Sequence, residues 1–191
     1  MVRADAERNI ASILEAGRRL LSVDHAASVA DIAKAAGVGR VTLYGHFPSR
    51  EQLVEAVMDR AVEQADHLLD DPELERMPAA EALTRLVGSS WEVLDQHSSL
   101  FVAADRLLPT ERIRESHAKP LHRVEQLIQR GRDEGEIRTD LPLSWLVSTF
   151  FAILHTAAAE VEAGRLDRAA AGETLRRTLA PVFSARSLPA G

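Results

Sequence analysis

The sequence of 191 residues contains no cysteine, which excludes a disulfide framework and a thiolate metal site. It also has no run that approaches the roughly 18 successive apolar residues of a membrane-spanning helix. Its first residues, MVRADAERNIASILEAG, carry charges where a secretory leader has an apolar segment. These absences predict a soluble, cytoplasmic protein in a reducing compartment, with no membrane partner.

Strand patterns are missing as well. No stretch alternates between apolar and polar residues, whereas apolar residues recur at helical spacing along most of the chain. Apolar residues make up 46% of the sequence, enough for a buried core. The fold is therefore predicted to be all-α, with about nine helices in total. After the N-terminal helices we expect others at about 50–69, 78–96, 98–107, 109–133, 142–163 and 167–184, separated by segments rich in Pro, Gly and Asp.

Charge is unevenly distributed along the chain. The net charge is −6, yet residues 1–50 hold seven basic and five acidic side chains. This N-terminal part is therefore +2, which leaves −8 for the remainder. Such segregation is compatible with a protein that binds an anion at one end only.

The N-terminal part contains two short helices joined by a tight turn. Ser28 and Asp31 have the spacing of a capping box at the start of the first helix. Gly37 supplies a residue that can adopt positive φ at its end, and a second helix is expected at about 39–45. Pro48 prevents this helix from continuing, and Ser49 begins the next one. A helix, a turn, a helix and a third capped helix form a device that presents the second short helix to the DNA major groove.

The string ASVADIAKAAGVGRVTLYGHFPSREQL closely resembles the DNA-binding segment of the tetracycline-repressor (TetR/AcrR) family of transcriptional regulators. The features that match are DIA, AAGV, TLYGHF and the pattern of SREQL, and they cover about a quarter of the chain. Two details depart from the family pattern. The turn SVDHAAS contains no glycine, and Arg50 stands where a lysine is usual, although a guanidinium still binds phosphate.

This resemblance implies the organisation and function of the whole chain. It implies a helix-turn-helix DNA-binding domain at residues 1–50 and a helical effector-binding and dimerisation domain at 51–191, with the helix at about 50–69 as connector. The implied function is that of a sequence-specific regulator, with repression as the default. A small-molecule effector, apolar or amphipathic, would release a homodimer from a pseudo-palindromic site on double-stranded DNA. The resemblance implies no cofactor and no metal.

Residue chemistry indicates how the short helix meets DNA. Arg40 can bridge guanine O6 and N7, and Thr42 can offer a hydroxyl group or contact a thymine methyl group. Contacts to phosphate, which position a protein without specifying sequence, are expected from Tyr44, His46, Ser49 and Arg50, and more weakly from Lys34.

Simpler roles compete with these functional ones. Leu43 and Phe47 are expected to be core residues that hold the short helix in place. Tyr44 could equally be a packing residue with its hydroxyl group in water. Arg40 taken alone would be an ordinary surface charge, and its place within the ordered motif is what favours DNA contact.

The last two predicted helices have wide apolar faces. Burial within the monomer is the default for such faces, and the family resemblance implies instead a four-helix interface between two copies. The residues predicted to form this dimer interface are Leu143, Leu146, Val147, Phe150, Leu154, Leu175, Leu179, Val182 and Phe183. A two-fold dimer would place two reading helices one DNA turn apart, roughly 34–36 Å.

Helices between residues 78 and 155 could enclose an effector pocket. The lining is expected to be mainly apolar with a few polar groups, although a filled core is the commoner fate of each residue. The predicted pocket residues are Trp91, Leu94, Phe101, Ile113, His117, Leu121, Val124, Phe151 and His155.

Two other classes of function compete with that of a regulator. An enzyme is less favoured, because the Glu-x-x-His, His-Glu-x-x-His and Gly-x-Ser-x-Gly spacings are absent, and a Ser-His-Asp site remains compatible with the sequence. His117 and His122, five residues apart, do not share a helix face well. A DNA-packaging protein without an effector would be expected to carry more basic charge.

Overall fold

The computed structural model describes residues 2–68 and 70–185, and every regular element in them is helical. A short 3-10 helix, η1 (Pro72–Glu75), lies between the fourth and fifth α-helices. The described residues thus confirm the all-α prediction. The α-helices are α1 (Val2–Leu21), α2 (Val29–Ala35), α3 (Arg40–His46), α4 (Arg50–Leu68), α5 (Ala79–Gln96), α6 (Ser98–Leu107), α7 (Thr110–Ser116), α8 (Ala118–Asp133), α9 (Leu143–Glu162) and α10 (Arg168–Phe183).

The chain divides into two compact units. The first contains residues 1–65 and 96–116, and the second contains residues 66–95 and 117–191. The first unit therefore holds α1 to α3, most of α4, α6 and α7, whereas the second holds α5, α8, α9 and α10. This division reflects packing, and the predicted functional boundary after residue 50 stays a prediction.

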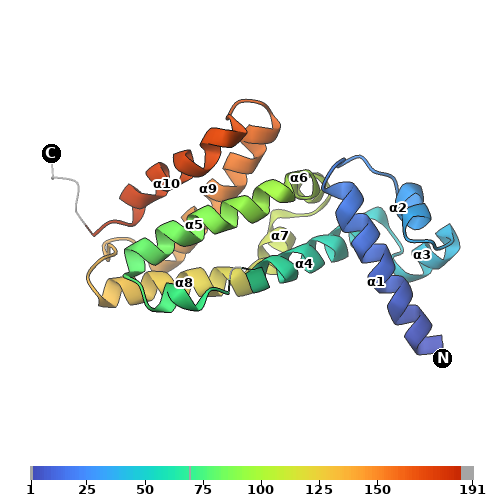
Figure 1. Cartoon of the computed structure of the whole chain (residues 1–191), viewed down its shortest axis with the longest axis horizontal. Helices are drawn as coiled ribbons and strands as arrows, with labels where there is room; N and C mark the ends of the chain where they lie inside the picture. The colour runs from blue at the N-terminus through green and yellow to red at the C-terminus, as the bar shows by residue number, and fades with distance from the viewer. Residues whose placement is uncertain (1, 69, 186–191) are drawn as a thin grey trace. The chain divides into compact units, whose positions relative to one another are not determined.

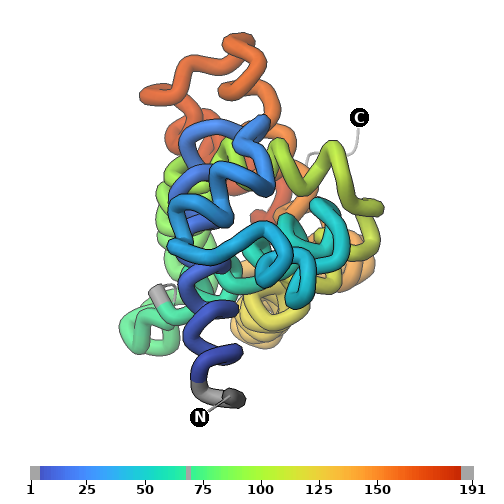
Figure 2. Tube along the Cα trace, turned by 90° about the vertical axis from the view of Figure 1, so that its right-hand side faces the viewer, coloured from blue at the N-terminus to red at the C-terminus, as the bar shows by residue number. Residues whose placement is uncertain are grey.

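In the first unit, α2 packs on α1 and α3 packs on α2. Figures 1 and 2 show these three helices as one cluster in blue. Gly17 on α1 allows α4 to approach closely, because a Cβ atom there would lie 2.6 Å from Cγ2 of Val57. The side chains of Ile13, Ile32 and Leu43 are fully buried, so the two short helices are held by an apolar core that α1 supplies.

In the second unit, α9 packs against both α8 and α10, and α9 and α10 lie side by side in Figure 1. By length and composition α9 is apolar enough to cross a membrane. One of its faces is buried within the unit, through residues such as Leu146, Phe150 and Leu154. This one-sided burial is that of a helix in the core of a globular domain.

The predicted single helix at 109–133 is wrong. The structure divides it into α7 and α8, with His117 between them as the N-cap residue of α8. Pro120 explains the break, because proline has no backbone N–H to donate to the carbonyl of Ser116 and its ring clashes with that carbonyl in a continuous helix. In the first turn of a new helix the missing N–H costs nothing. This break raises the number of α-helices in the described residues from the expected nine to ten.

Candidate functional site

The local signals that predicted two short helices correspond to observed contacts. The backbone N–H of Asp31 donates to Oγ of Ser28 at 3.1 Å, and the backbone N–H of Ser28 donates to the Asp31 carboxylate at 3.3 Å. These bonds complete the capping box. The pKa of the Asp31 carboxyl is lowered by the Ser28 hydroxyl group, which donates to it at 2.6 Å, and then by the Ser28 backbone N–H. Gly37 adopts φ +70° after α2, a conformation that side chains other than glycine disfavour. The predicted helix–turn–helix geometry is thereby confirmed.

The outward face of α3 consists of chemically varied exposed side chains. Arg40, Thr42 and Tyr44 are exposed, and Leu43 is fully buried beneath them. Tyr44 is 47% exposed, so it is not a core residue. This arrangement makes the three polar side chains available to a ligand as large as a nucleic acid.

Val41 is the exposed residue that sequence reasoning missed. Its side chain is 88% exposed on α3, between Arg40 and Thr42. The sequence indicated that Val41 is exposed, because Leu43 was expected to be buried and a residue two positions earlier on a helix faces a different direction. An exposed aliphatic side chain adds an apolar group to the hydrogen-bonding groups of α3.

Three further residues predicted to contact DNA lie close to this face in the sequence. Lys34 on α2 is exposed, and His46 at the end of α3 is partly exposed. Ser49 accepts a hydrogen bond from the backbone N–H of Gln52 at 3.2 Å, so its hydroxyl group caps α4. The N-cap role of Ser49 is confirmed, and its phosphate contact stays a prediction.

Arg50 has a structural role that the sequence did not reveal. Its Nη1 donates to the carbonyl oxygen of Ala27 at 2.6 Å, and its Nη2 donates to that of His25 at 3.1 Å. Both acceptors belong to the loop between α1 and α2, which lacks the glycine usual in the family. The Asp24 carboxylate also accepts from the backbone N–H of Ala26 at 2.8 Å. These side chains fix the loop, and a phosphate contact by Arg50 would have to be made in addition.

We expect the variant Arg50→Ala to lower the free energy of unfolding by about 1–2 kcal/mol, because two partly buried carbonyl groups lose a charged donor. Thermal or urea denaturation measures the change. Arg40→Ala is the matched control, since Arg40 is exposed on α3 and its removal should leave stability nearly unchanged. Equal stability of the two variants would show that the bonds to the loop contribute nothing.

Acidic residues of α4 pair with α7 and α8 at a constant separation in the sequence. Glu55 pairs with Arg112, and Asp59 accepts a hydrogen bond from Ser116, within the first unit. Asp66 pairs with Arg123 within the second unit. The partners are 57 residues apart in each case. Asp66 is 2% exposed, and its carboxylate oxygens lie 3.0 Å from Nη1 of Arg123 and 2.9 Å from Nζ of Lys119.

The residues predicted to line an effector pocket fall into both units. Phe101 and Ile113 belong to the first unit, and the other seven belong to the second. Among these seven, His117, Phe151 and His155 form an aromatic cluster with ring centroids 4.1–5.3 Å apart. Burial, with a smaller contribution from His117, lowers the pKa of His155 to about 3, so this imidazole is neutral at physiological pH. That these nine residues line an effector pocket stays a prediction.

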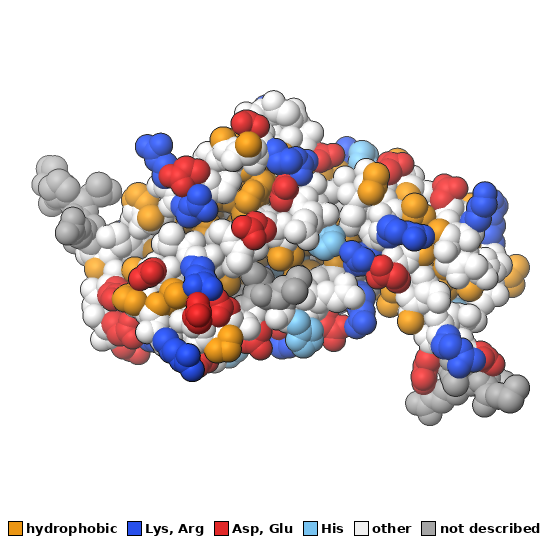
Figure 3. Space-filling view, viewed as in Figure 1, with side chains coloured by type: hydrophobic (Ala, Val, Ile, Leu, Met, Phe, Trp, Pro, Cys, Tyr) orange, Lys and Arg blue, Asp and Glu red, His pale blue; other side chains and the backbone are white. Residues whose placement is uncertain are grey.

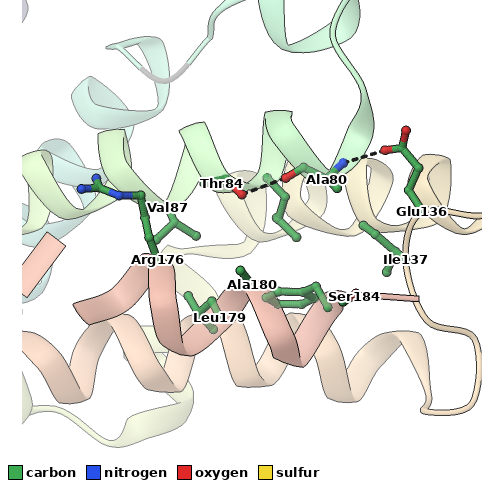
Figure 4. Close-up of a pocket in the computed structure, with 11 residues that line it drawn as sticks. Ala80, Thr84, Val87, Glu136, Ile137, Arg176, Leu179, Ala180 and Ser184 are labelled. Carbon is green, nitrogen blue, oxygen red and sulfur yellow. Dashed lines mark hydrogen bonds between the residues drawn. The ribbon is translucent and has the colours of Figure 1, made fainter. Parts of the chain in front are cut away.

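A cavity in the second unit is lined by other residues. It lies between α5, the segment that follows α8, and α10 (Figure 4), and its volume is about 170 Å³. Leu83, Val87, Ile137, Leu179 and Phe183 supply its apolar lining. Leu179 and Phe183 are instead predicted from the sequence to face a second copy of the chain. The cavity itself could not be predicted from local sequence patterns, because its walls come from three distant segments.

The residues predicted for the dimer interface mostly belong to the core of a single chain. Leu143 and Val182 are partly exposed, and the other seven are at most 6% exposed. Phe150, for example, is 4% exposed and Leu179 is 1% exposed. A charge at either position would test the core of the second unit rather than the association of two copies.

The opposite faces of α9 and α10 are exposed; that of α9 is largely uncharged, whereas α10 also exposes Arg168, Glu173 and Arg177. Trp145, 60% exposed, begins this face on α9. A large exposed aromatic side chain amid small uncharged residues is typical of a protein interface. The exposed uncharged residues are Ser144, Trp145, Ala152, Thr156 and Ala159 on α9, and Ala169, Ala170, Thr174, Thr178, Ala180 and Pro181 on α10.

Surface charge elsewhere is mixed in sign. On the face shown in Figure 3, Lys and Arg side chains are interspersed with Asp and Glu side chains. Such a surface does not produce a broad field of one sign. Any attraction to an anion must therefore be local, as the charge balance of residues 1–50 suggested.

Comparison with known proteins identifies the N-terminal segment. Residues 13–57 match the family described as "Bacterial regulatory proteins, tetR family". The HTH-type transcriptional regulator EthR of Mycolicibacterium smegmatis is 38% identical over 79 residues, which are 40% of this chain and 36% of EthR. The repressor LfrR of the same organism is 31% identical over 87 residues, or 46% of each chain. The chain therefore spans well under two thirds of the curated relatives it matches, and these relatives are named as transcriptional regulators rather than enzymes.

Solved structures match over nearly the whole chain. The regulator FadR from Bacillus subtilis, in complex with stearoyl-CoA, has a TM-score of 0.71 at 19% identity, and the matched region covers 88% of this chain and 96% of the FadR chain. The regulator LfrR from Mycobacterium smegmatis, in complex with proflavine, has a TM-score of 0.66 at 20% identity, and the matched region covers 91% of this chain and 94% of the LfrR chain. At such identities the likeness establishes the fold alone. Residues 13–57 therefore belong to the tetR family of bacterial regulatory proteins, and the chain as a whole shares the fold of the solved regulators.

Proposed function

We propose that this protein is a repressor that binds a pseudo-palindromic operator as a homodimer and is released by a small-molecule effector. TetR-family proteins are helix-turn-helix transcriptional regulators, typically repressors. The observation that carries the proposal is the exposed face of α3, where Arg40, Val41, Thr42 and Tyr44 surround the buried Leu43. A DNA-binding regulator of this kind acts in the cytoplasm, which is the location we propose.

The side chains on α3 have complementary tasks in this proposal. Arg40 and Thr42 read base edges in the major groove through hydrogen bonds. Tyr44 and His46, with Lys34 on α2, contact phosphate oxygens and set the position of the helix. Ser49 caps α4 and places its first backbone N–H groups near the same strand of DNA.

Selection of bound sequences from random DNA by the purified protein tests this function. A palindromic motif with two half-sites about one helical turn apart is expected. Binding that ignores sequence would instead favour a DNA-packaging role, and the absence of any DNA binding would refute the proposal. The Arg40→Ala variant, selected in parallel, should lose preference at one position of each half-site.

Val41 is expected to contact the methyl group of a thymine in the selected operator. Replacing that thymine by deoxyuridine removes only the methyl group, and burial of one such group contributes about 0.8 kcal/mol. The wild-type protein should therefore bind more weakly, by about fourfold per half-site, and the Val41→Ala variant should be nearly insensitive. Val23→Ala is the matched control, because Val23 is 83% exposed but lies outside α3. A Val41→Ala variant that retains the full sensitivity to deoxyuridine would contradict this contact.

The homodimer of this proposal uses the exposed faces of α9 and α10 rather than their buried ones. Two copies of this helix pair would form a four-helix interface, with Trp145 covered by the partner. On α9, burial of uncharged alanine and threonine residues avoids the cost of desolvating charges. The exposure of this face in the single chain supports the proposal.

The effector is proposed to bind in the second unit. FadR and LfrR are named in complexes with stearoyl-CoA and proflavine, so related folds accommodate organic ligands. In this chain an effector would act by preferring one arrangement of the dimer over another, and the coupling would be reciprocal with DNA. The aromatic cluster of His117, Phe151 and His155 remains a predicted contact region.

A further inference from the structure

The cavity between α5 and α10 is closed at one end by a close approach of these two helices. A Cβ atom on Gly172 of α10 would lie 3.2 Å from Cδ1 of Trp91 on α5. One turn further along α10, Nη1 of Arg176 lies 3.5 Å from the position that a Cβ atom would have on Gly88. The guanidinium group of Arg176 thus lies beside α5 at van der Waals distance.

The other end of the cavity is also fixed. The carboxylate of Glu136 accepts a hydrogen bond from the backbone N–H of Ala80 at 2.9 Å, at the start of α5. Ile137 forms an antiparallel bridge with Ser184, in which the backbone N–H of Arg138 donates to Phe183 at 3.0 Å. Figure 4 shows Arg176 and Glu136 at opposite ends, with apolar side chains between them. Because both ends are held, the unfilled space is a feature of the folded unit.

Small side chains keep the space open. Ala80 and Thr84 on α5 and Ala180 on α10 line the cavity, where larger residues would fill it. Ala80 and Ala180 are exposed, so the cavity is open to solvent. A cavity of about 150 Å³ with an apolar lining holds one benzene molecule, so a volume of about 170 Å³ fits a body of about six to eight carbon atoms.

Arg176 supplies a cation at the rim. Its Nε and Nη2 donate to the Glu173 carboxylate at 3.1 and 2.9 Å, whereas Nη1 lies beside Gly88 and donates to no acceptor among the described residues. The side chains of Arg176 and Glu173 are 42% and 61% exposed, and such a surface ion pair is weak. A ligand carboxylate can therefore bond to this guanidinium. Glu136, in contrast, already caps α5.

We propose that the cavity between α5 and α10 binds a small monocarboxylic acid, with its apolar body against Leu83, Leu179 and Phe183 and its carboxylate on Arg176. The volume accommodates the body of a single ring or a short chain. The cavity is distinct from the cluster of His117, Phe151 and His155. Binding of the acid does not depend on DNA. Only its role as an effector rests on the proposed function.

Isothermal titration of the full-length protein, without DNA, tests this site with benzoate, cyclohexanecarboxylate and hexanoate as probes. Saturable binding of at least one probe is expected, with benzyl alcohol, the neutral analogue of benzoate, binding more weakly. Arg176→Gln should weaken carboxylate binding by about tenfold or more and leave the binding of benzyl alcohol unchanged. Ala180→Phe should abolish both by filling the cavity.

Two variants on the same helix serve as controls. Arg177→Gln removes a neighbouring exposed charge, and Ala169→Phe adds a ring at an exposed position outside the cavity lining; both should bind the probes like the wild type. Failure of all three acids to bind, or binding that survives Ala180→Phe, would overturn the site. Binding that Arg176→Gln does not weaken would overturn the role of the carboxylate. Because DNA is absent, none of these results depends on operator recognition.

Discussion

Asp66→Asn is expected to lower the free energy of unfolding by about 2–3 kcal/mol, measured by urea denaturation. The substitution keeps the shape of the side chain but removes a buried negative charge that faces Arg123 and Lys119. Arg123 is 25% exposed, so it would retain a charge that is incompletely hydrated and has only the exposed Asp70, at 3.6 Å, as an acidic partner. Partial exposure of the two cations keeps the expected loss below that of a fully buried pair.

Asp70→Asn is the matched control for this substitution. Asp70 also pairs with Arg123, at 3.6 Å, but its side chain is 73% exposed. Removing its charge should change stability by less than about 0.5 kcal/mol. If Asp66→Asn had an equally small effect, the buried carboxylate would not stabilise the attachment of α4 to α8.

The dimer should dissociate when a charge is placed on the exposed face of α9. Ala152→Glu puts a carboxylate at the centre of the proposed interface, where the partner would remove it from water without a counter-charge. The monomer should stay folded, because Ala152 is exposed in the single chain. Loss of the second half-site contact should weaken operator binding by about a hundredfold or more.

Sedimentation velocity and circular dichroism together test this interface. The wild type is expected to sediment as a dimer at micromolar concentration, and Ala152→Glu as a monomer with unchanged helicity. Ala118→Glu, an identical change at an exposed position of α8, should leave the dimer intact. A dimer that persists in the Ala152→Glu variant would place the interface elsewhere.

Features with local causes were predictable from the sequence. The capping box at Ser28 and the positive φ of Gly37 depend on residues within one helical turn. The helix–turn–helix and the exposure of α3 follow from these signals and from the spacing of apolar residues. The start of α4 at Ser49 was predictable for the same reason.

Features that depend on distant partners were not predictable in this way. Arg50 bonds to carbonyl groups 23 and 25 residues earlier in the chain, and no local pattern marks these acceptors. Apolar stripes on α9 and α10 showed that some face is buried, but not whether the chain itself or a second copy buries it. The break at His117 was missed for a different reason, because apolar periodicity outweighed the signal from Pro120.

The pairing of α4 with α7 and α8 also determines where the chain tolerates changes of length. The partners of Arg112, Ser116 and Arg123 on α4 all lie 57 residues earlier in the chain. One residue inserted between Ser116 and Arg123 would rotate the following side chains by about 100° and separate Arg123 from Asp66. An insertion in the segment 70–78, in contrast, changes every offset equally and leaves all three pairs intact. Relatives of this protein should therefore differ in length before α5 and not at the junction of α7 and α8.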